Sequence, residues 1–330
     1  MCVRTDSAGF IALTWACWSQ YPGVRMDVDA EMPEYRALAS YYAGKGGALW
    51  SAETDGQVVG MIATRPLDDG TWEICRVYVL PALHGDGLGH RLLDTAEAHA
   101  FAAGATRLAL WSDTRFDRAH RFYEKRSYIR SGPVRVLDDI SNSLEYGFGK
   151  PVSGIEVLDA AAAVSAIPRL ADILIACVAE GSGVSFLPPL APDVARAFWR
   201  DTTRDVAAGS KVLLAGWVDG VLAGTVTLAF ASPQNQRHRA DVVKLLVHPD
   251  GRRHGLARRL MARLELEASR AGRPLLTLDT RLGDRAERLY RSMNWMEYGR
   301  IPGYAVQVDG TFEETLFMWK RLDQAAPRSI

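Results

Sequence analysis

Carboxylate and phenol side chains recur in the same order in the two halves of this 330-residue chain. Carboxylates can accept a proton from a nucleophile, and a phenol can donate one to a leaving group. The candidates for proton transfer form two matched sets: Glu73, Asp113 and Tyr123 in the first half, and Asp241, Asp279 and Tyr290 in the second. The similar spacing of the two sets along the chain requires secondary-structure elements that occur twice.

Each half also carries a glycine-containing loop in front of an expected helix. The loops are His84–Gly89 (HGDGLG) and Arg252–Ala257 (RRHGLA). A helix N-terminus offers unpaired N–H groups and a partial positive charge, and small residues let the backbone approach a ligand closely. We therefore expect both loops to bind a phosphate group.

A dinucleotide-binding loop of the Rossmann type is the competing interpretation of the first loop. That loop requires G-x-G-x-x-G and an acidic residue about 20 positions later. Gly85, Gly87 and Asp113 fit this pattern, but His90 occupies the third glycine position and the second loop keeps only Gly255. The dinucleotide interpretation is therefore the weaker one.

The stretches around these residues match as well, which indicates a tandem duplication. Trp72–Pro81 corresponds to Ala240–Pro249, and Asp117–Tyr123 corresponds to Asp284–Tyr290. The repeat is about one domain long, too long for a solenoid unit. We assign residues 1–148 to a first domain with a truncated first strand, 149–154 to a linker and 155–330 to a second domain.

The elements that hold these residues are predicted to be strands and helices in the same order in each copy. In the second copy, Asp219-Gly220 separates two apolar runs and predicts a hairpin over 211–229. Apolar residues at helical spacing follow over 252–271, and a buried strand is expected over 275–280. This order predicts a mixed α/β sheet in each half.

The composition is that of a globular protein and excludes several classes. Hydrophobic residues make up 48% and charged residues 24% of the chain. Lys+Arg and Asp+Glu both total 39, so the basic excess typical of nucleic-acid binding is missing. The four cysteines (Cys2, Cys17, Cys75 and Cys177) have no zinc-ligand spacing, and no apolar run approaches a membrane span. We expect no metal, nucleic-acid or membrane partner, and a reducing cytoplasmic location.

Both loops resemble motif A of the GCN5-related N-acetyltransferase (GNAT) family, Q/R-x-x-G-x-G/A after a strand ending in V-x-P. The second copy matches through Arg252, Gly255 and Ala257, whereas the first has His84 at the first position and an acidic Asp86. The resemblance covers nearly the whole chain. It implies two tandem acyl-CoA N-acyltransferase domains, each with a central, mostly antiparallel sheet flanked by helices.

The resemblance implies acetyl-CoA as the acetyl donor and CoA as a product. The loop amides would hold the pyrophosphate, Val77 and Leu245 would offer backbone N–H groups to the thioester oxygen, and Val79 and Val247 would pair with pantetheine. The implied cofactor-binding residues are Val77, Val79, His84, Gly85, Asp86, Gly87, Leu88, Gly89 and His90, and Leu245, Val247, Arg252, Arg253, His254, Gly255, Leu256, Ala257 and Arg258.

The same resemblance assigns roles to the two matched sets. The acids Glu73 and Asp241, or Asp113 and Asp279, would take the proton of the attacking amine, and Tyr123 and Tyr290 would protonate the departing thiolate. Each has a structural alternative: core packing for the tyrosines, a helix cap for the strand-end aspartates and a solvated strand end for the others. His120 and His254 are expected at the surface.

We expect an N-acetyltransferase with an active second domain that acetylates a small amino-acid-like or antibiotic-like amine, in a chain that could form homodimers. Within the family the second copy resembles the tabtoxin resistance acetyltransferases, through Gly181–Phe186, Ala240–Val247 and Pro302–Tyr304 among other stretches. Two alternatives stay open: an acyl-CoA sensor or scaffold with one or both domains silent, and a tandem enzyme of the mycothiol-synthase type.

Overall fold

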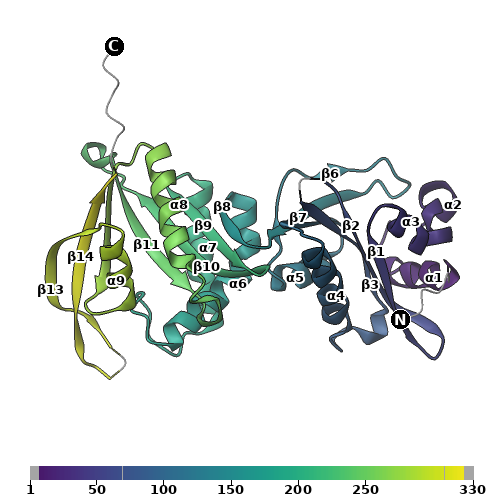
Figure 1. The fold of residues 1–330 in the computed structure, drawn as a ribbon, viewed down its shortest axis with the longest axis horizontal. Coiled ribbons are helices and arrows are strands. Elements are labelled where there is room, and N and C mark those ends of the chain that lie inside the picture. The colour runs from purple at the N-terminus through teal and green to yellow at the C-terminus, as the bar shows by residue number, and fades with distance from the viewer. Residues whose placement is uncertain (1–6, 69, 308, 323–330) are drawn as a thin grey trace, which may run out of the picture. The chain divides into compact units, whose positions relative to one another are not determined.

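The structure, a computed structural model, describes residues 7–68, 70–307 and 309–322. The chain divides into two compact units, Met1–Val152 and Ser153–Ile330. Within the described residues each of the two sheets has seven strands, and each unit combines its sheet with helices (Figure 1). The predicted fold class, two mixed α/β domains in tandem, is confirmed.

Unit 1 holds the first copy. Its helices and strands are α1 (Ser7–Trp18), α2 (Val28–Glu31), η1 (Pro33–Ala37), α3 (Leu38–Gly44), β1 (Ala48–Thr54), β2 (Gln57–Pro66), β3 (Thr71–Val79), η2 (Pro81–Leu83), α4 (Leu88–Ala102), β4 (Arg107–Asp113), α5 (Asp117–Lys125), β5 (Ile129–Arg130), β6 (Arg135–Val136) and β7 (Leu144–Pro151). The strand order is β1-β2-β3-β4-β7-β5, with β6 paired to β7. All neighbours are antiparallel except β3 and β4.

Two cores cover the faces of the unit 1 sheet because side chains alternate along β2. Met61 and Ala63 pack with Phe10 of α1, whereas Ile62 packs with the α4 leucines. Both α1 and α4 therefore lie against the central strands, on opposite faces (Figure 1).

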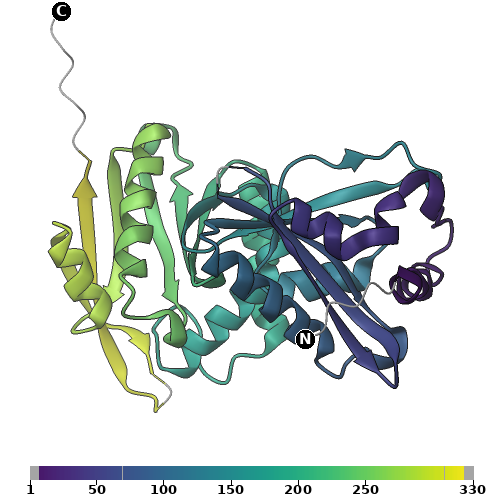
Figure 2. The same ribbon diagram turned by 45° about the vertical axis from the view of Figure 1, so that its right-hand side comes forward.

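Unit 2 repeats this plan. Its elements are β8 (Gly154–Leu158), α6 (Ala160–Ala179), α7 (Pro192–Ala207), β9 (Lys211–Val218), β10 (Val221–Phe230), η3 (Gln234–Gln236), β11 (Arg239–Val247), η4 (Pro249–Gly251), α8 (Leu256–Arg270), β12 (Leu275–Arg281), α9 (Arg285–Ser292), β13 (Met296–Val306) and β14 (Phe312–Arg321). The strand order is β13-β14-β12-β11-β10-β9-β8. Among the described strands of this unit, β11 and β12 are the parallel neighbours and the other pairs are antiparallel. Figure 2 shows α8 lying along this sheet, with the β13–β14 hairpin at the end of the unit.

The spacing of apolar residues correctly predicts the face of α8 that is buried. Leu256, Leu260, Met261, Leu264 and Ala268 all join one core cluster with residues of β10, β11, β12 and β14. The helix is held by this stripe, since the residues between are largely charged.

The ends of the domains differ in detail from the expectation. Gly149–Pro151, expected in the linker, extend β7, because this strand pairs with β4 as far as Arg107. The first described helix begins at Ser7, so any earlier strand of unit 1 would lie in residues 1–6, outside the described residues. The strand β13 was not predicted from the sequence, because its side chains are mostly exposed and follow no buried periodicity.

One described helix is long and apolar enough to cross a membrane, which corrects the expectation that no such run exists. It is α6, and 61% of its most apolar window is buried inside unit 2. A core helix meets the same criteria of length and composition, so α6 is weak support for a membrane span.

Candidate active site

The two sheets open at corresponding places. The parallel strands β3 and β4 pair only from Thr71–Glu73 to Arg107–Ala109, and β11 and β12 pair only from Arg239–Asp241 to Leu275–Thr277. Beyond these points each pair of strands parts, although β3 and β11 continue for six more residues. In both units the gap between the two separated strands can therefore receive a ligand.

A β-bulge lies in the parted segment of each unit. In unit 1 the pairing of β3 with β2 passes from Tyr78 to Cys75, and in unit 2 that of β11 with β10 passes from Leu246 to Val243. The register leaves Val77 and Leu245, the expected thioester-binding residues, without a direct partner on either neighbouring strand. This placement suits a backbone that must contact a ligand.

The glycine loops turn into helices as expected. Gly87 caps α4 with φ of +77° and Gly255 caps α8 with φ of +68°, both in the left-handed region that favours glycine. Among the described residues, the N–H groups of 85–90 and of 253–258 have no protein acceptor, and the first helical bonds come from Arg91 and Arg259. Each loop therefore presents a cluster of unpaired amides suited to an anion.

His84 and Arg252, which differ between the two motifs, perform the same contact. His84 Nε2 lies 2.9 Å from the Val79 carbonyl oxygen, and Arg252 Nε donates to that of Val247 at 3.3 Å. Arg252 also forms an ion pair with Glu180. The histidine in the first copy thus preserves the loop anchor, while Asp86 stays exposed in the loop itself.

A cavity of about 860 Å³ lies in unit 1, where β3 and β4 part. Its walls include most of the expected first-copy residues: Glu73, Val77, Val79, His84, Gly85, Gly87, Leu88, Gly89, His90, Asp113 and Tyr123. Asp86 is missing from this lining. The structure therefore brings the glycine-containing loop, the strand-end acid and the tyrosine of unit 1 to one cavity.

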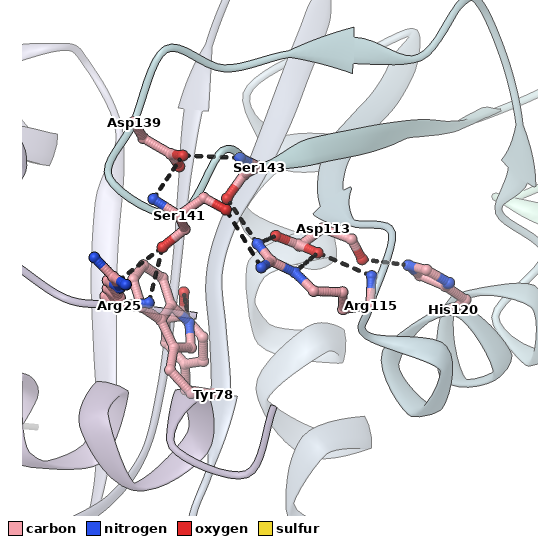
Figure 3. A network of polar contacts seen from close by, with 9 residues as sticks. Arg25, Tyr78, Asp113, Arg115, His120, Asp139, Ser141 and Ser143 are labelled. Carbon is pink, nitrogen blue, oxygen red and sulfur yellow. Dashed lines mark hydrogen bonds and ion pairs between the residues drawn. The ribbon is translucent and has the colours of Figure 1, made fainter. Parts of the chain in front are cut away.

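Asp113 is held in an ion pair within this cavity. The Arg115 guanidinium donates to both carboxylate oxygens, at 2.8 and 2.5 Å, and also to Ser143 Oγ at 3.0 Å. Figure 3 shows the network continuing through Asp139 and Ser141. Although burial opposes ionisation, these bonds hold the pKa of Asp113 below its usual value, which disfavours it as a proton acceptor.

His120 is buried, contrary to the expectation, with 7% of its surface exposed. Its Nε2 lies 2.9 Å from the Asp113 carbonyl oxygen, and its ring packs against Tyr146 and Phe148. Burial lowers the pKa of the imidazole. The residue therefore braces the strand end; His254, by contrast, is exposed as expected.

The acids at the start of the parted strands also have partners. Glu73 forms an ion pair with Arg65 at 2.6 Å, and Asp241 forms one with Arg239 at 2.8 Å while accepting a bond from Thr277. Either carboxylate would have to accept a substrate proton while it still binds these partners.

Asp279 is the exception among the four acids. Its side chain is exposed, and within the described part of the chain it makes no hydrogen bond or ion pair. It acts electrostatically on both Lys244 and Tyr290. In unit 1 the equivalent carboxylate, that of Asp113, is paired with Arg115. In unit 2 the equivalent arginine, Arg281, pairs with Glu313 instead, so the Asp279 carboxylate has no arginine partner among the described residues.

The two tyrosines occupy matching buried positions. Tyr123 and Tyr290 are each 6% exposed and belong to the core clusters of their units. Burial raises the pKa of both phenols well above the ordinary value, and the Asp279 carboxylate adds to this effect on Tyr290. Both phenols are thus protonated at neutral pH and can act as donors.

Arg76, Arg115 and Lys244 were not predicted as site residues, but the structure places them around the two sites. Arg76 and Lys244 occupy the same position in the matching strands, so the repeat itself contained the signal. Arg115 could not be recognised, since its role depends on the turn that returns its guanidinium to Asp113.

Comparison with known proteins agrees with this arrangement. A family model described as "Acetyltransferase (GNAT) family" matches residues 10–128 and 183–295. An uncharacterized N-acetyltransferase of Azospirillum brasilense is 34% identical over 106 residues, 32% of this chain and 61% of that protein. The aminoalkylphosphonate N-acetyltransferase of Salmonella typhimurium is 38% identical over 82 residues, 23% of this chain and 53% of that protein. The chain thus spans about three fifths or less of these two relatives.

Among solved structures, a putative acetyltransferase of Salmonella typhimurium, described with its cofactor acetyl-CoA, is similar over 54% of this chain and 99% of its own. The sequence identity is 22% and the TM-score is 0.44.

Proposed function

Because the chain belongs to the acetyltransferase (GNAT) family, we propose that it transfers an acetyl group from acetyl-CoA directly to the amine of a small acceptor. The observation that supports this most is the pairing, in both units, of parted parallel strands with a loop of unpaired amides. The parted strands admit an extended chain, and the amides suit a pyrophosphate.

Acetyl-CoA would supply the activated acetyl group and a thiolate leaving group. The amides of 85–90 and 253–258 would bind its pyrophosphate, and Val77 and Leu245 would offer N–H groups to the thioester oxygen. Val79 and Val247 would pair with pantetheine through backbone groups other than the carbonyls that His84 and Arg252 already contact.

We place catalysis in unit 2. An alkyl ammonium must lose a proton before it attacks, and Asp279 has an unshared carboxylate to receive it, directly or through water. Tyr290, protonated and buried beside it, would return a proton to the thiolate. Asp241 would have a smaller part, because its carboxylate already binds Arg239 and Thr277.

Release of free CoA thiol in the presence of a panel of small amines tests this proposal. Gly255→Val should abolish the release, because a β-branched residue is strained at φ of +68° and would distort the anion-binding amides. Gly87→Val disrupts the corresponding loop of unit 1 and should leave release by unit 2 in place. Loss with Gly87→Val alone would reassign the active unit, and no release from the unaltered protein with any amine would refute the transferase proposal.

Unit 1 has a second candidate function, as a holder of acyl-CoA without turnover. Its cavity is open, but Asp113 is locked by Arg115 and Asp86 places a negative charge in the phosphate loop. Calorimetric titration with acetyl-CoA gives the number of sites. Two binding sites, of which one persists in Gly255→Val although this variant releases no CoA, support binding of acyl-CoA by unit 1 without turnover. A single binding site that is lost in Gly255→Val contradicts it.

The remaining features of the proposal concern the acceptor and the setting. We propose a small amino-acid-like amine, in line with the resemblance of the second copy to the tabtoxin resistance acetyltransferases, and a cytoplasmic protein able to form homodimers. The three cysteines among the described residues, Cys17, Cys75 and Cys177, are free thiols, which suits a reducing compartment.

A further inference from the structure

Arg76 and Lys244 are equivalent basic residues at the two β-bulges. Their backbones adopt left-handed φ values of +53° and +54°, which few residues other than glycine adopt. In unit 1, Arg76 lines the same cavity as Asp113 and Tyr123. The repeated fold therefore places Lys244 at the corresponding site of unit 2, together with Asp279 and Tyr290.

The two cations differ in their partners. Arg76 forms an ion pair with Glu34 at 2.5 Å and lies over the ring of Tyr35, so its charge is already neutralised. Lys244 makes no ion pair with any residue that the structure describes. Its Nζ donates to the Val184 carbonyl oxygen at 2.9 Å and to Ser185 Oγ at 3.1 Å, both neutral acceptors.

The surroundings of Lys244 are aromatic, and aromatic rings attract a cation without neutralising its charge. Its ammonium lies 5.8 Å from the ring centre of Phe186 and 5.3 Å from that of Phe198. Burial lowers the pKa of this amine, Asp279 opposes that shift, and Lys211 adds to it. An ammonium has three N–H donors, of which two are used by neutral oxygens, so one donor is left for a ligand and no carboxylate among the described residues pairs with the ammonium.

We propose that the acceptor of unit 2 carries an anionic group, a carboxylate or phosphonate, which binds Lys244 and thereby directs the amine of the same molecule toward Asp279. This inference rests on the proposed function and names its substrate class. In unit 1, the ion pair of Arg76 with Glu34 neutralises the charge that could recognise such a group. The presence of Glu34 as a counter-ion in unit 1 would therefore make the two units differ in substrate specificity.

The test compares acceptors that differ only in the anionic group. Amino acids are paired with their amides, and aminoethylphosphonate is paired with ethylamine, each assayed by CoA release with acetyl-CoA saturating. The unaltered protein should favour the anionic member in kcat/KM. Lys244→Met should reduce this preference by at least about tenfold, mainly through KM, as expected for one charge-assisted hydrogen bond. Lys244→Arg should retain part of it.

Lys211→Met is the matched control. Lys211 lies close enough to act on Lys244, but its own ammonium already pairs with Asp205 at 2.9 Å. Its removal should leave the preference unchanged. If Lys244→Met instead lowers activity equally on both members of each pair, Lys244 only holds the 184–186 segment and the inference is refuted.

A binding measurement separates this inference from the proposed function. Calorimetric titration of the same acceptor pairs into the protein saturated with CoA reports recognition without turnover. Tighter binding of the anionic members that is lost in Lys244→Met supports the inference even if no acetyl transfer occurs. Equal binding of both members of each pair to the unaltered protein overturns it, whatever the outcome for catalysis.

Discussion

Tyr290→Phe separates the proposed catalytic role of this tyrosine from its role in the core. The Tyr290 hydroxyl makes no hydrogen bond to any described residue, whereas its ring packs on Trp295 at 5.9 Å between ring centres. Phenylalanine keeps the ring and removes only the hydroxyl. The free energy of unfolding should therefore change by less than about 1 kcal/mol, since no intramolecular hydrogen bond is lost.

The expected effect on catalysis is much larger. Proton donation by a positioned side chain contributes about 10²-fold or more, which corresponds to about 2.7 kcal/mol in activation free energy. Because the pKa of Tyr290 is raised well above its ordinary value, the phenol stays protonated throughout the usual assay range. The loss in kcat should therefore be similar at pH 6 and pH 9.

The assay is CoA release at saturating acetyl-CoA, with KM for acetyl-CoA and the thermal midpoint as controls. We expect kcat to fall by about 10²-fold while KM and the midpoint are nearly unchanged. A kcat within twofold of the unaltered protein, for an acceptor whose chemical step limits the rate, would refute the role. A large drop in the thermal midpoint would instead show that the hydroxyl supports the fold.

Two further predictions concern stability. Asp113 has a pKa held below its ordinary value in the folded state, so its contribution to stability is present above the unfolded pKa near 4 and is lost as the pH falls through the folded pKa. Arg115→Met should therefore narrow the difference in urea midpoint between pH 7 and pH 3, and an unchanged difference would contradict this account. Leu260→Ala removes a fully buried side chain from the α8 stripe and should cost about 2–5 kcal/mol in chemical denaturation, whereas Leu266→Ala, at an exposed position of the same helix, should cost under about 1 kcal/mol.

Much of the fold could be predicted because its signals are local or repeated. The Asp219-Gly220 turn fixes the β9–β10 hairpin, and the apolar stripe of α8 fixes its buried face. The same order of strands and helices was predicted in both copies, and the structure has this order in both units. In contrast, β13 lies at a sheet edge with exposed side chains, so no hydrophobic period distinguishes it from a loop.

The sequence by itself determined the duplicated fold, the two glycine-containing loops before α4 and α8 and the order of candidate acids and phenols, because these depend on residue type and spacing. Only the tertiary structure decided how equivalent residues differ. Arg115 returns to Asp113 in unit 1, while Arg281 turns to Glu313 and leaves Asp279 open. Likewise, Glu34 neutralises Arg76, but the segment over Lys244 offers it only neutral oxygens. These partners lie in segments that are distant along the chain or that return through a turn. The distances between the paired groups are therefore set by tertiary packing and not by sequence spacing.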